Sequence, residues 1–218
     1  MGEVPSSAGS AASGQGEQRS SASEGSPGVL DGLDGSAVLT SEQIAQIYQR
    51  DVAGQAKSLQ IKNPPVVKVV RYVQPREFGQ TLVACLNERG IPATVDPDGA
   101  GYSLGDVPKS QEGAANLAQF ECFAMYPVHP QYRLPASSKE KVRYYEYLVN
   151  VQVPCLRKLG YMLDNVPSES VWIAHFSDPW DPENEIMSTA GRDGVKKAMA
   201  ACPRADPATI IEHPPALK

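Results

Sequence analysis

The sequence lacks the features that would assign it to several broad classes of protein. It has no run of about 18 apolar residues, so no segment of this chain is expected to span a membrane. Its short basic groups alternate with glutamates instead of gathering on one face, which argues against a nucleic-acid partner. The motifs G-x-S-x-G and H-E-x-x-H are missing, and so is a phosphate-binding loop. The sequence therefore predicts no cofactor and no catalytic motif.

The first 39 residues contain no aromatic residue and consist mainly of serine, glycine and alanine. Such a segment buries too little apolar surface to offset its chain entropy, so we expect a disordered tail or tether over 1–39. It holds five acidic residues and one arginine, and most of the net charge of −5 therefore lies in it. A single folded domain is expected over 40–211, followed by a proline-containing tail over 212–218.

Hydrophobic spacing and capping signals predict an α+β domain that is mainly helical with a small β-sheet. Thr40 and Gln43 form a capping box for a helix that ends near residue 60. Branched residues over 66–73 predict a strand, and residues 91–95 predict a second. A third short strand is possible over 161–163. Further helices are expected to begin near Pro75, Pro108, Ser137, Ser168 and Gly194, with a kink at Pro154.

One short pattern, V-x-C-L-x-x-x-G, occurs at residues 83–90 and again at 153–160. Each copy is followed by an apolar segment, a Val-Pro pair and helical sequence that ends in a second cysteine. This order indicates two related half-units, about 66–126 and 137–204, and a chance similarity is the alternative.

The four cysteines allow three disulfide connectivities, and sequence alone does not choose among them. A duplicated unit should duplicate its own bridge, which favours Cys85–Cys122 and Cys155–Cys202. A zinc site is disfavoured because no close C-x₂₋₄-C pair occurs. Free thiols in a reducing cytosol are the remaining alternative. We favour disulfides, which place the folded domain outside the cytoplasm.

Several spaced motifs resemble a group of uncharacterised actinobacterial secreted proteins and lipoproteins, over roughly residues 64–204. They are VACLNERGIPATVDPDG, YPVHPQY, VPCLRKLGY, and a late W-x-P and CP. The resemblance implies export, often with a lipid-anchored N-terminus ahead of a Ser/Gly-rich tether, and it implies no activity. The chain shows neither a signal peptide nor a lipidation cysteine, so a lipid anchor is expected on a segment not present here.

The loop SDPWDPENE, residues 177–185, is the best candidate for a binding surface. It lengthens the second half-unit, and extra residues in a repeat are expected in a surface loop. Prolines stiffen the loop around Trp180, which makes its ring an anchor for a partner or a sugar, unless the ring folds back onto the helices. We therefore expect Trp180, His175, Asp178 and Asp181 to border the functional surface. The loop lacks the pattern of a calcium-binding loop, so no metal is expected.

Function is predicted only at the level of class. The leading hypothesis is a non-enzymatic, extracytoplasmic binding or interaction protein of the cell envelope, whose partner is an envelope protein or a cell-wall ligand. One alternative is a small envelope hydrolase that uses His175 as the base and Asp178 as the orienting carboxylate. Another is a cytosolic protein with free thiols.

Overall fold

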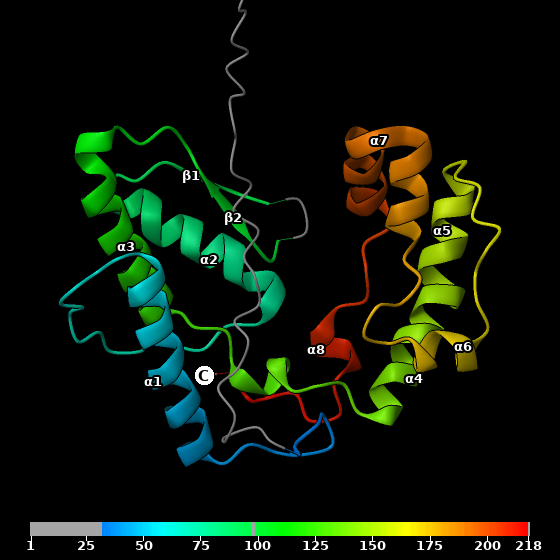
Figure 1. Ribbon diagram of the computed structural model, residues 1–218, viewed down its shortest axis with the longest axis horizontal. Coiled ribbons are helices and arrows are strands. Elements are labelled where there is room, and N and C mark those ends of the chain that lie inside the picture. The colour runs from blue at the N-terminus through cyan, green and yellow to red at the C-terminus, as the bar shows by residue number, and fades with distance from the viewer. Residues whose placement is uncertain (1–31, 97–98, 218) are drawn as a thin grey trace, which may run out of the picture.

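The computed structural model describes residues 32–96 and 99–217, which form two lobes (Figure 1). The first lobe combines three helices with a small antiparallel sheet, which packs against α2. Its elements are α1 (Ser41–Ser58), α2 (Pro75–Glu88), β1 (Ala93–Val95), β2 (Tyr102–Leu104), the 3₁₀ turn η1 (Lys109–Gln111) and α3 (Glu112–Met125).

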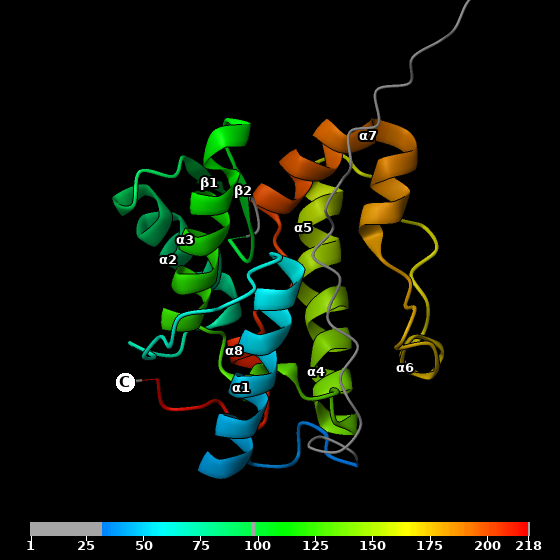
Figure 2. The ribbon, with the colours of Figure 1, turned by 60° about the vertical axis from the view of Figure 1, so that its left-hand side comes forward.

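The second lobe is entirely helical in the described residues. Its elements are α4 (Ser138–Tyr147), the π-helical segment η3 (Leu148–Gln152), α5 (Val153–Lys158), α6 (Glu169–Ala174) and α7 (Pro182–Ala201). The chain crosses between the lobes through 126–137, which contains η2 (Pro130–Arg133). It crosses back through 203–212, which contains α8 (Pro207–Ile210) and lies between the lobes (Figures 1 and 2). No helix in the described ranges is long and apolar enough to cross a bilayer.

Each lobe has its own apolar core and its own disulfide bond. In the first lobe, Cys85 of α2 is bonded to Cys122 of α3, with 5.9 Å between their Cα atoms. Both sulfurs lie in a core that includes Leu82, Leu86, Ile91, Ala115 and Ala118. The bridge thus joins the two helices that bury the sheet's inner face.

The second lobe is closed by a bond between Cys155 of α5 and Cys202 at the end of α7, with a Cα separation of 5.8 Å. Its core includes Leu148, Leu156, Leu163, Trp172 and Ile186. The mainly helical α+β fold and both predicted bridges are confirmed. Common descent of the two half-units stays a prediction, because the β-hairpin of the first lobe has no counterpart among the described residues of the second.

The predicted strand at 66–73 is wrong as a strand, although the segment is extended beside the chain that follows α3. The Val70 amide donates to the Met125 carbonyl at 2.8 Å, and only Val73 forms a β-bridge, with Val128. Prolines in the neighbouring segment 126–130 have no amide to donate, so the ladder cannot continue. The strand predicted at 91–95 is confirmed in part, as β1, and residues 161–163 form no strand.

Pro154 does not kink the helix in the predicted way. The chain instead widens into η3, where the Val153 amide donates to the Leu148 carbonyl five residues earlier, and α5 then continues. The wider turn places Pro154 in the first turn of α5, where a missing amide costs least.

The second half of the loop SDPWDPENE is helical, so the prediction of a loop followed by a helix from Gly194 is wrong. α7 begins at Pro182, and the Asp181 side chain caps it by accepting from the Glu183 amide at 2.9 Å. Asp-Pro is a helix-start signal as well as a loop signal, and here it starts the helix. The added length is not confined to the surface either, since Ile186 is 1% exposed.

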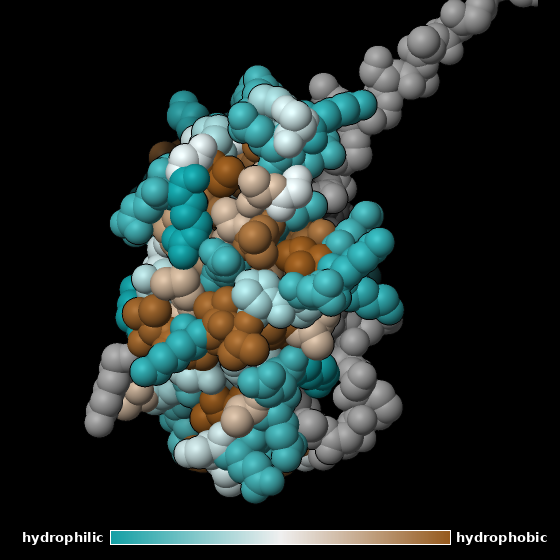
Figure 3. Space-filling model, turned by 90° about the vertical axis from the view of Figure 1, so that its left-hand side faces the viewer, coloured by the Kyte–Doolittle hydropathy of each residue, from teal (hydrophilic) through white to brown (hydrophobic). Residues whose placement is uncertain are grey.

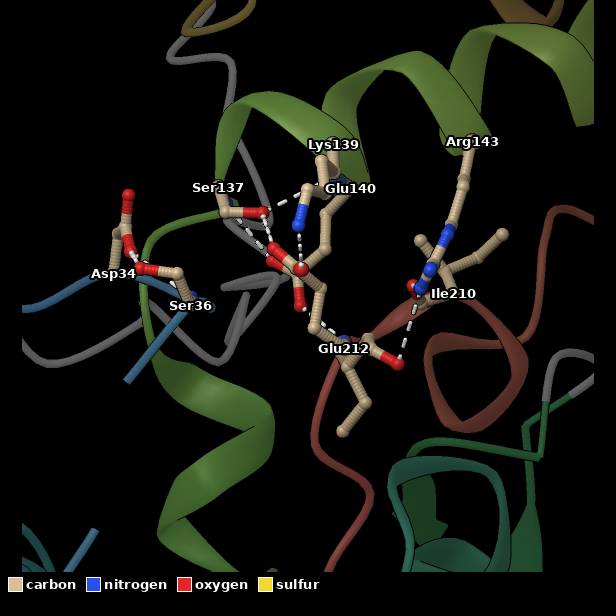
Figure 4. Close-up of polar contacts among 9 residues, drawn as sticks. Asp34, Ser36, Ser137, Lys139, Glu140, Arg143, Ile210 and Glu212 are labelled. Atoms are coloured by element: carbon tan, nitrogen blue, oxygen red, sulfur yellow. Dashed lines mark hydrogen bonds and ion pairs between the residues drawn. The ribbon is translucent and has the colours of Figure 1, made fainter. Parts of the chain in front are cut away.

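Polar residues at the start of α4 and Glu212, in the segment after α8, form one hydrogen-bonded group. We call it the terminal clasp, and it consists of Ser137, Lys139, Glu140 and Glu212 (Figure 4). The buried Glu140 carboxylate accepts from the Ser137 amide at 2.9 Å and from the Glu212 amide at 2.8 Å. The Glu212 carboxylate in turn accepts from the Ser137 hydroxyl at 2.5 Å and from Lys139 Nζ at 3.1 Å. The predicted tail at 212–218 is thus attached to the domain at its first residue.

His129 supplies a pH-sensitive contact in the connection between the lobes. It is 9% exposed, and its Nδ1 accepts from the Gln131 amide at 3.1 Å. Burial lowers the pKa of His129 below its ordinary value of 6.5. The unfolded chain therefore binds a proton more readily than the folded protein, so stability is lost as the pH falls below 6.5 toward the folded pKa.

We expect urea unfolding at a series of pH values to show this loss in the wild-type protein and not in His129→Asn. Asparagine keeps an acceptor at this N-cap position and does not titrate. An equal loss of stability in both proteins over that range would assign the effect to other groups.

Candidate functional site

A cleft of about 840 Å³ lies between the two lobes. One wall comes from the start of α2 and the turn between β1 and β2, and the other from α7. The third side is formed by residues 203–207. Small-molecule sites commonly have volumes of about 300–1,000 Å³ and lie between lobes or domains. This cleft is therefore the candidate functional site.

The α7 wall carries the large apolar side chains of the cleft, with charged residues beside them, and is built from two arms of one kinked helix. Met187 lies on the first arm, and Val195, Lys196 and Met199 lie on the second. Gly191, with a φ of 66°, turns the chain between them so that both arms border the cleft. That φ is strained for residues with a Cβ atom. Methionines adapt their shape to a ligand, and Met187 is 45% exposed, so this wall is open to one.

The opposite wall depends on a close approach between α2 and the β1–β2 turn. Pro75 and Arg76 line the cleft from the first turn of α2. Behind them, the Gly79 amide donates to the Gly99 carbonyl at 3.0 Å. A Cβ atom on Gly79 would lie 2.2 Å from the Gly101 carbonyl oxygen, so only glycine permits this contact. The contact fixes where the first lobe borders the cleft.

Arg204 links the two walls. Its Nε donates to Glu183 Oε1 at 2.6 Å and its Nη2 donates to Asp181 Oδ2 at 2.6 Å, which ties it to the start of α7. Arg76 of α2 donates to the Arg204 backbone carbonyl. The Arg204 side chain is 59% exposed, so these ion pairs position the residue more than they stabilise the fold.

The cleft carries charges of both signs around its apolar wall. Its charged residues are Arg76, Arg192, Lys196, Arg204, Asp96, Glu183 and Asp193. An apolar wall with a charged rim suits a ligand that has an apolar body and a polar end. Across the described ranges, no group of three or more His, Cys, Asp and Glu side chains could hold a metal ion.

His175 and Asp178 are close in the sequence, but the structure gives their side chains no catalytic arrangement. His175 Nδ1 lies 2.9 Å from the Val171 carbonyl oxygen, and the Asp178 amide donates to the His175 carbonyl. Both side chains are exposed, and neither lines the cleft between the lobes.

Trp180 combines the two predicted alternatives, a ring that anchors a partner and a ring that folds back onto the helices. Its ring is half-buried against the core of the second lobe, and its Nε1 donates to Glu185 Oε1 at 2.8 Å. Its backbone carbonyl accepts from Trp172 Nε1 at 3.1 Å. Asp181 is the predicted site residue nearest the cleft, because it holds Arg204. A binding role for these four residues stays a prediction.

Sequence reasoning missed the cleft because its walls come from distant segments. Arg76 and Arg204 are 128 residues apart in the chain. Neither lies in a motif, and the Cys202-Pro203 pair next to Arg204 indicates the end of a half-unit and a resemblance, but no site. A glycine inside an otherwise helical run, as at Gly191, was the available signal that α7 turns.

Comparisons with known proteins supply no relative. No family model, no curated protein and no solved structure matches this chain.

Proposed function

We propose that this protein is a non-enzymatic, extracytoplasmic binding protein of the cell envelope, whose ligand occupies the cleft between its lobes. The observation that carries the proposal is the cleft itself: about 840 Å³, with an apolar wall from α7 and charged residues from both lobes. A ligand there would contact both lobes at once, and the contact between Arg76 and Arg204 already orients them.

The disulfide bonds support the proposed location. All four cysteines are bridged. Disulfides persist in oxidising compartments and are rare in a reducing cytosol. This arrangement disfavours the alternative of a cytosolic protein with free thiols. A lipid anchor on the native form, as the resemblance implies, remains part of the proposal, and thiol labelling of protein taken from its own cells would test the location.

The ligand class follows from the walls. Met187, Val195 and Met199 offer apolar contact, and the exposed Lys196 extends from the same helix. We expect an amphiphile with an acidic end to bind better than one with a basic end. The hydrolase alternative is weaker, because His175 and Asp178 lie outside this cleft.

The test is to block the cleft and follow a defined probe. Decanoate is titrated into the ¹⁵N-labelled full chain, with decyltrimethylammonium in parallel, and amide shifts are recorded. We expect decanoate to shift amides on both walls. Ala200→Trp, at an exposed cleft-lining position on α7, should weaken decanoate binding about tenfold or more by filling the site.

The matched control is Ala53→Trp, which adds the same ring to an exposed position on α1. It should leave binding unchanged, and neither variant should lower the melting temperature. Shifts confined to residues outside the cleft, or equal affinity in both variants, would contradict the proposed site.

A further inference from the structure

The loop between α1 and α2 lies on the outer side of the first lobe, away from α7 (Figures 1 and 2). We call residues 59–72 the valine loop. Val66 is 103% exposed and Val70 is 57% exposed, and the neighbouring Pro64 and Pro65 are exposed as well. Seen from this side, hydrophobic residues gather near the middle of the face, with hydrophilic residues around them (Figure 3). Exposed apolar clusters of this kind mark interaction surfaces.

The valine loop is also basic, in an acidic protein. It contains Lys62, Lys68 and Arg71 and no acidic residue, in a chain of net charge −5. Lys57, Lys62 and Lys68 are exposed, and no ion pair within the described ranges engages them. Because the chain as a whole is negative, attraction to an anionic surface has to come from a local basic group, and the valine loop supplies one beside exposed apolar side chains.

Hydrogen bonds to the backbone of the valine loop hold the segment that carries Val66 and Val70. The Val70 amide donates to the Met125 carbonyl at 2.8 Å, and the Val73 amide donates to the Pro127 carbonyl at 3.0 Å. The Tyr48 hydroxyl donates to the Val67 carbonyl at 3.3 Å from α1. The exposed valines therefore project from a segment held by both α1 and the end of α3, and little order has to be gained on binding.

We propose that the valine loop docks the protein onto an anionic bilayer surface, with Val66 and Val70 in the interface and Lys62 and Lys68 beside the lipid phosphates. A few apolar side chains are too small a surface for a stable protein–protein interface, which buries about 1,200–2,000 Å². A fluid lipid interface needs no complementary groove, and apolar insertion adds there to the attraction between lysines and acidic headgroups. Docking on this face leaves the cleft open to its ligand.

The experiment measures binding of the full chain to vesicles of phosphatidylcholine with phosphatidylglycerol, and to vesicles of phosphatidylcholine alone, by co-sedimentation. We expect binding to the anionic vesicles only, and weaker binding as salt screens the charges. The double variant Lys62→Gln/Lys68→Gln should lower the partition coefficient about 25-fold, since each lysine near an anionic surface contributes about fivefold. Val66→Ser should lower it about tenfold.

Matched variants on the other lobe separate local docking from general charge. Lys158→Gln/Lys197→Gln makes the same change in net charge at exposed positions, and Val171→Ser removes a valine that is 50% exposed. Neither should change vesicle binding. Equal losses in the matched variants, or no binding to anionic vesicles at low salt, would overturn the proposal. So would self-association of the protein that Val66→Ser abolishes while vesicle binding persists, because the loop would then be a protein contact.

Discussion

Removing either disulfide bond is expected to lower the free energy of unfolding by about 4 kcal/mol. The bridges close loops with sequence separations of 37 and 47 residues, and the chain-entropy model gives nearly equal effects for the two lengths. The measurement is urea unfolding of Cys85→Ser/Cys122→Ser and of Cys155→Ser/Cys202→Ser beside the wild-type protein. Since each bridge lies within one lobe, each pair of substitutions should loosen its own lobe first, which hydrogen exchange resolved by residue would show.

The two bridges should differ in how readily they are reduced in the folded protein. Cys85, Cys122 and Cys202 are buried, whereas Cys155 is partly exposed. A dithiol reductant must reach a sulfur atom, so we expect the Cys155–Cys202 bridge to open first under native conditions.

Two outcomes of the unfolding experiment would contradict the stability prediction. If both double variants keep wild-type stability, the bridges do not constrain the unfolded chain as the model requires. Exchange that rises in the lobe opposite the substitution would contradict independent closure of the lobes.

Local signals in the sequence were sufficient for most helices and for the bridges. The capping box of Thr40 and Gln43 is present with both hydrogen bonds, and the Ser137 box is present as well. The pairing of Cys85 with Cys122 followed from the repeated pattern around each first cysteine. The caps depend on residues within one turn of each other, so local sequence reports them directly, whereas the bridges span 37 and 47 residues and only the repeated pattern indicated them.

One error lies where a distant segment decides the local structure. The branched residues at 66–73 have strand propensity, but Pro127 and Pro130 limit the ladder on the neighbouring segment. At 182–185 the error has a local cause. Proline is typical of loops, but after the capping residue Asp181 it begins a helix.

The candidate cleft was beyond sequence reasoning for a related reason. Its walls come from distant segments, and Arg204 links them through its ion pair with α7 and the hydrogen bond that its carbonyl accepts from Arg76 of α2. Trp180 was predicted from the composition of its loop, and in the structure its partly buried ring packs against the core of the second lobe. Composition predicts which side chains can bind a ligand, but only the fold brings them to one place.

The terminal clasp supports the second large expected effect: Glu140→Ala should lower the free energy of unfolding by about 3 kcal/mol. The Glu140 side chain is 2% exposed and accepts from two backbone amides, of Ser137 and of Glu212. Alanine leaves both donors in a buried site without this acceptor, and the cost of an unmade hydrogen bond to a charged group is about 1.5–3 kcal/mol. Urea unfolding measures the loss.

Two further variants test whether the loss of stability is specific to the Glu140 carboxylate. Glu146→Ala removes an exposed carboxylate from the same helix and should leave stability within about 0.5 kcal/mol of wild type. Glu140→Gln keeps the shape but turns one acceptor into a donor, which opposes one of the two amides, so its loss should lie between those of the other variants. Because the Glu212 amide is one of the two donors, Glu140→Ala should also speed hydrogen exchange at Glu212 and in the segment after α8. Equal stability of Glu140→Ala and Glu146→Ala would show that the clasp does not hold the C-terminal segment, and that other contacts keep α8 in place, such as the burial of Ile210 and the hydrogen bond from Arg143 to its carbonyl.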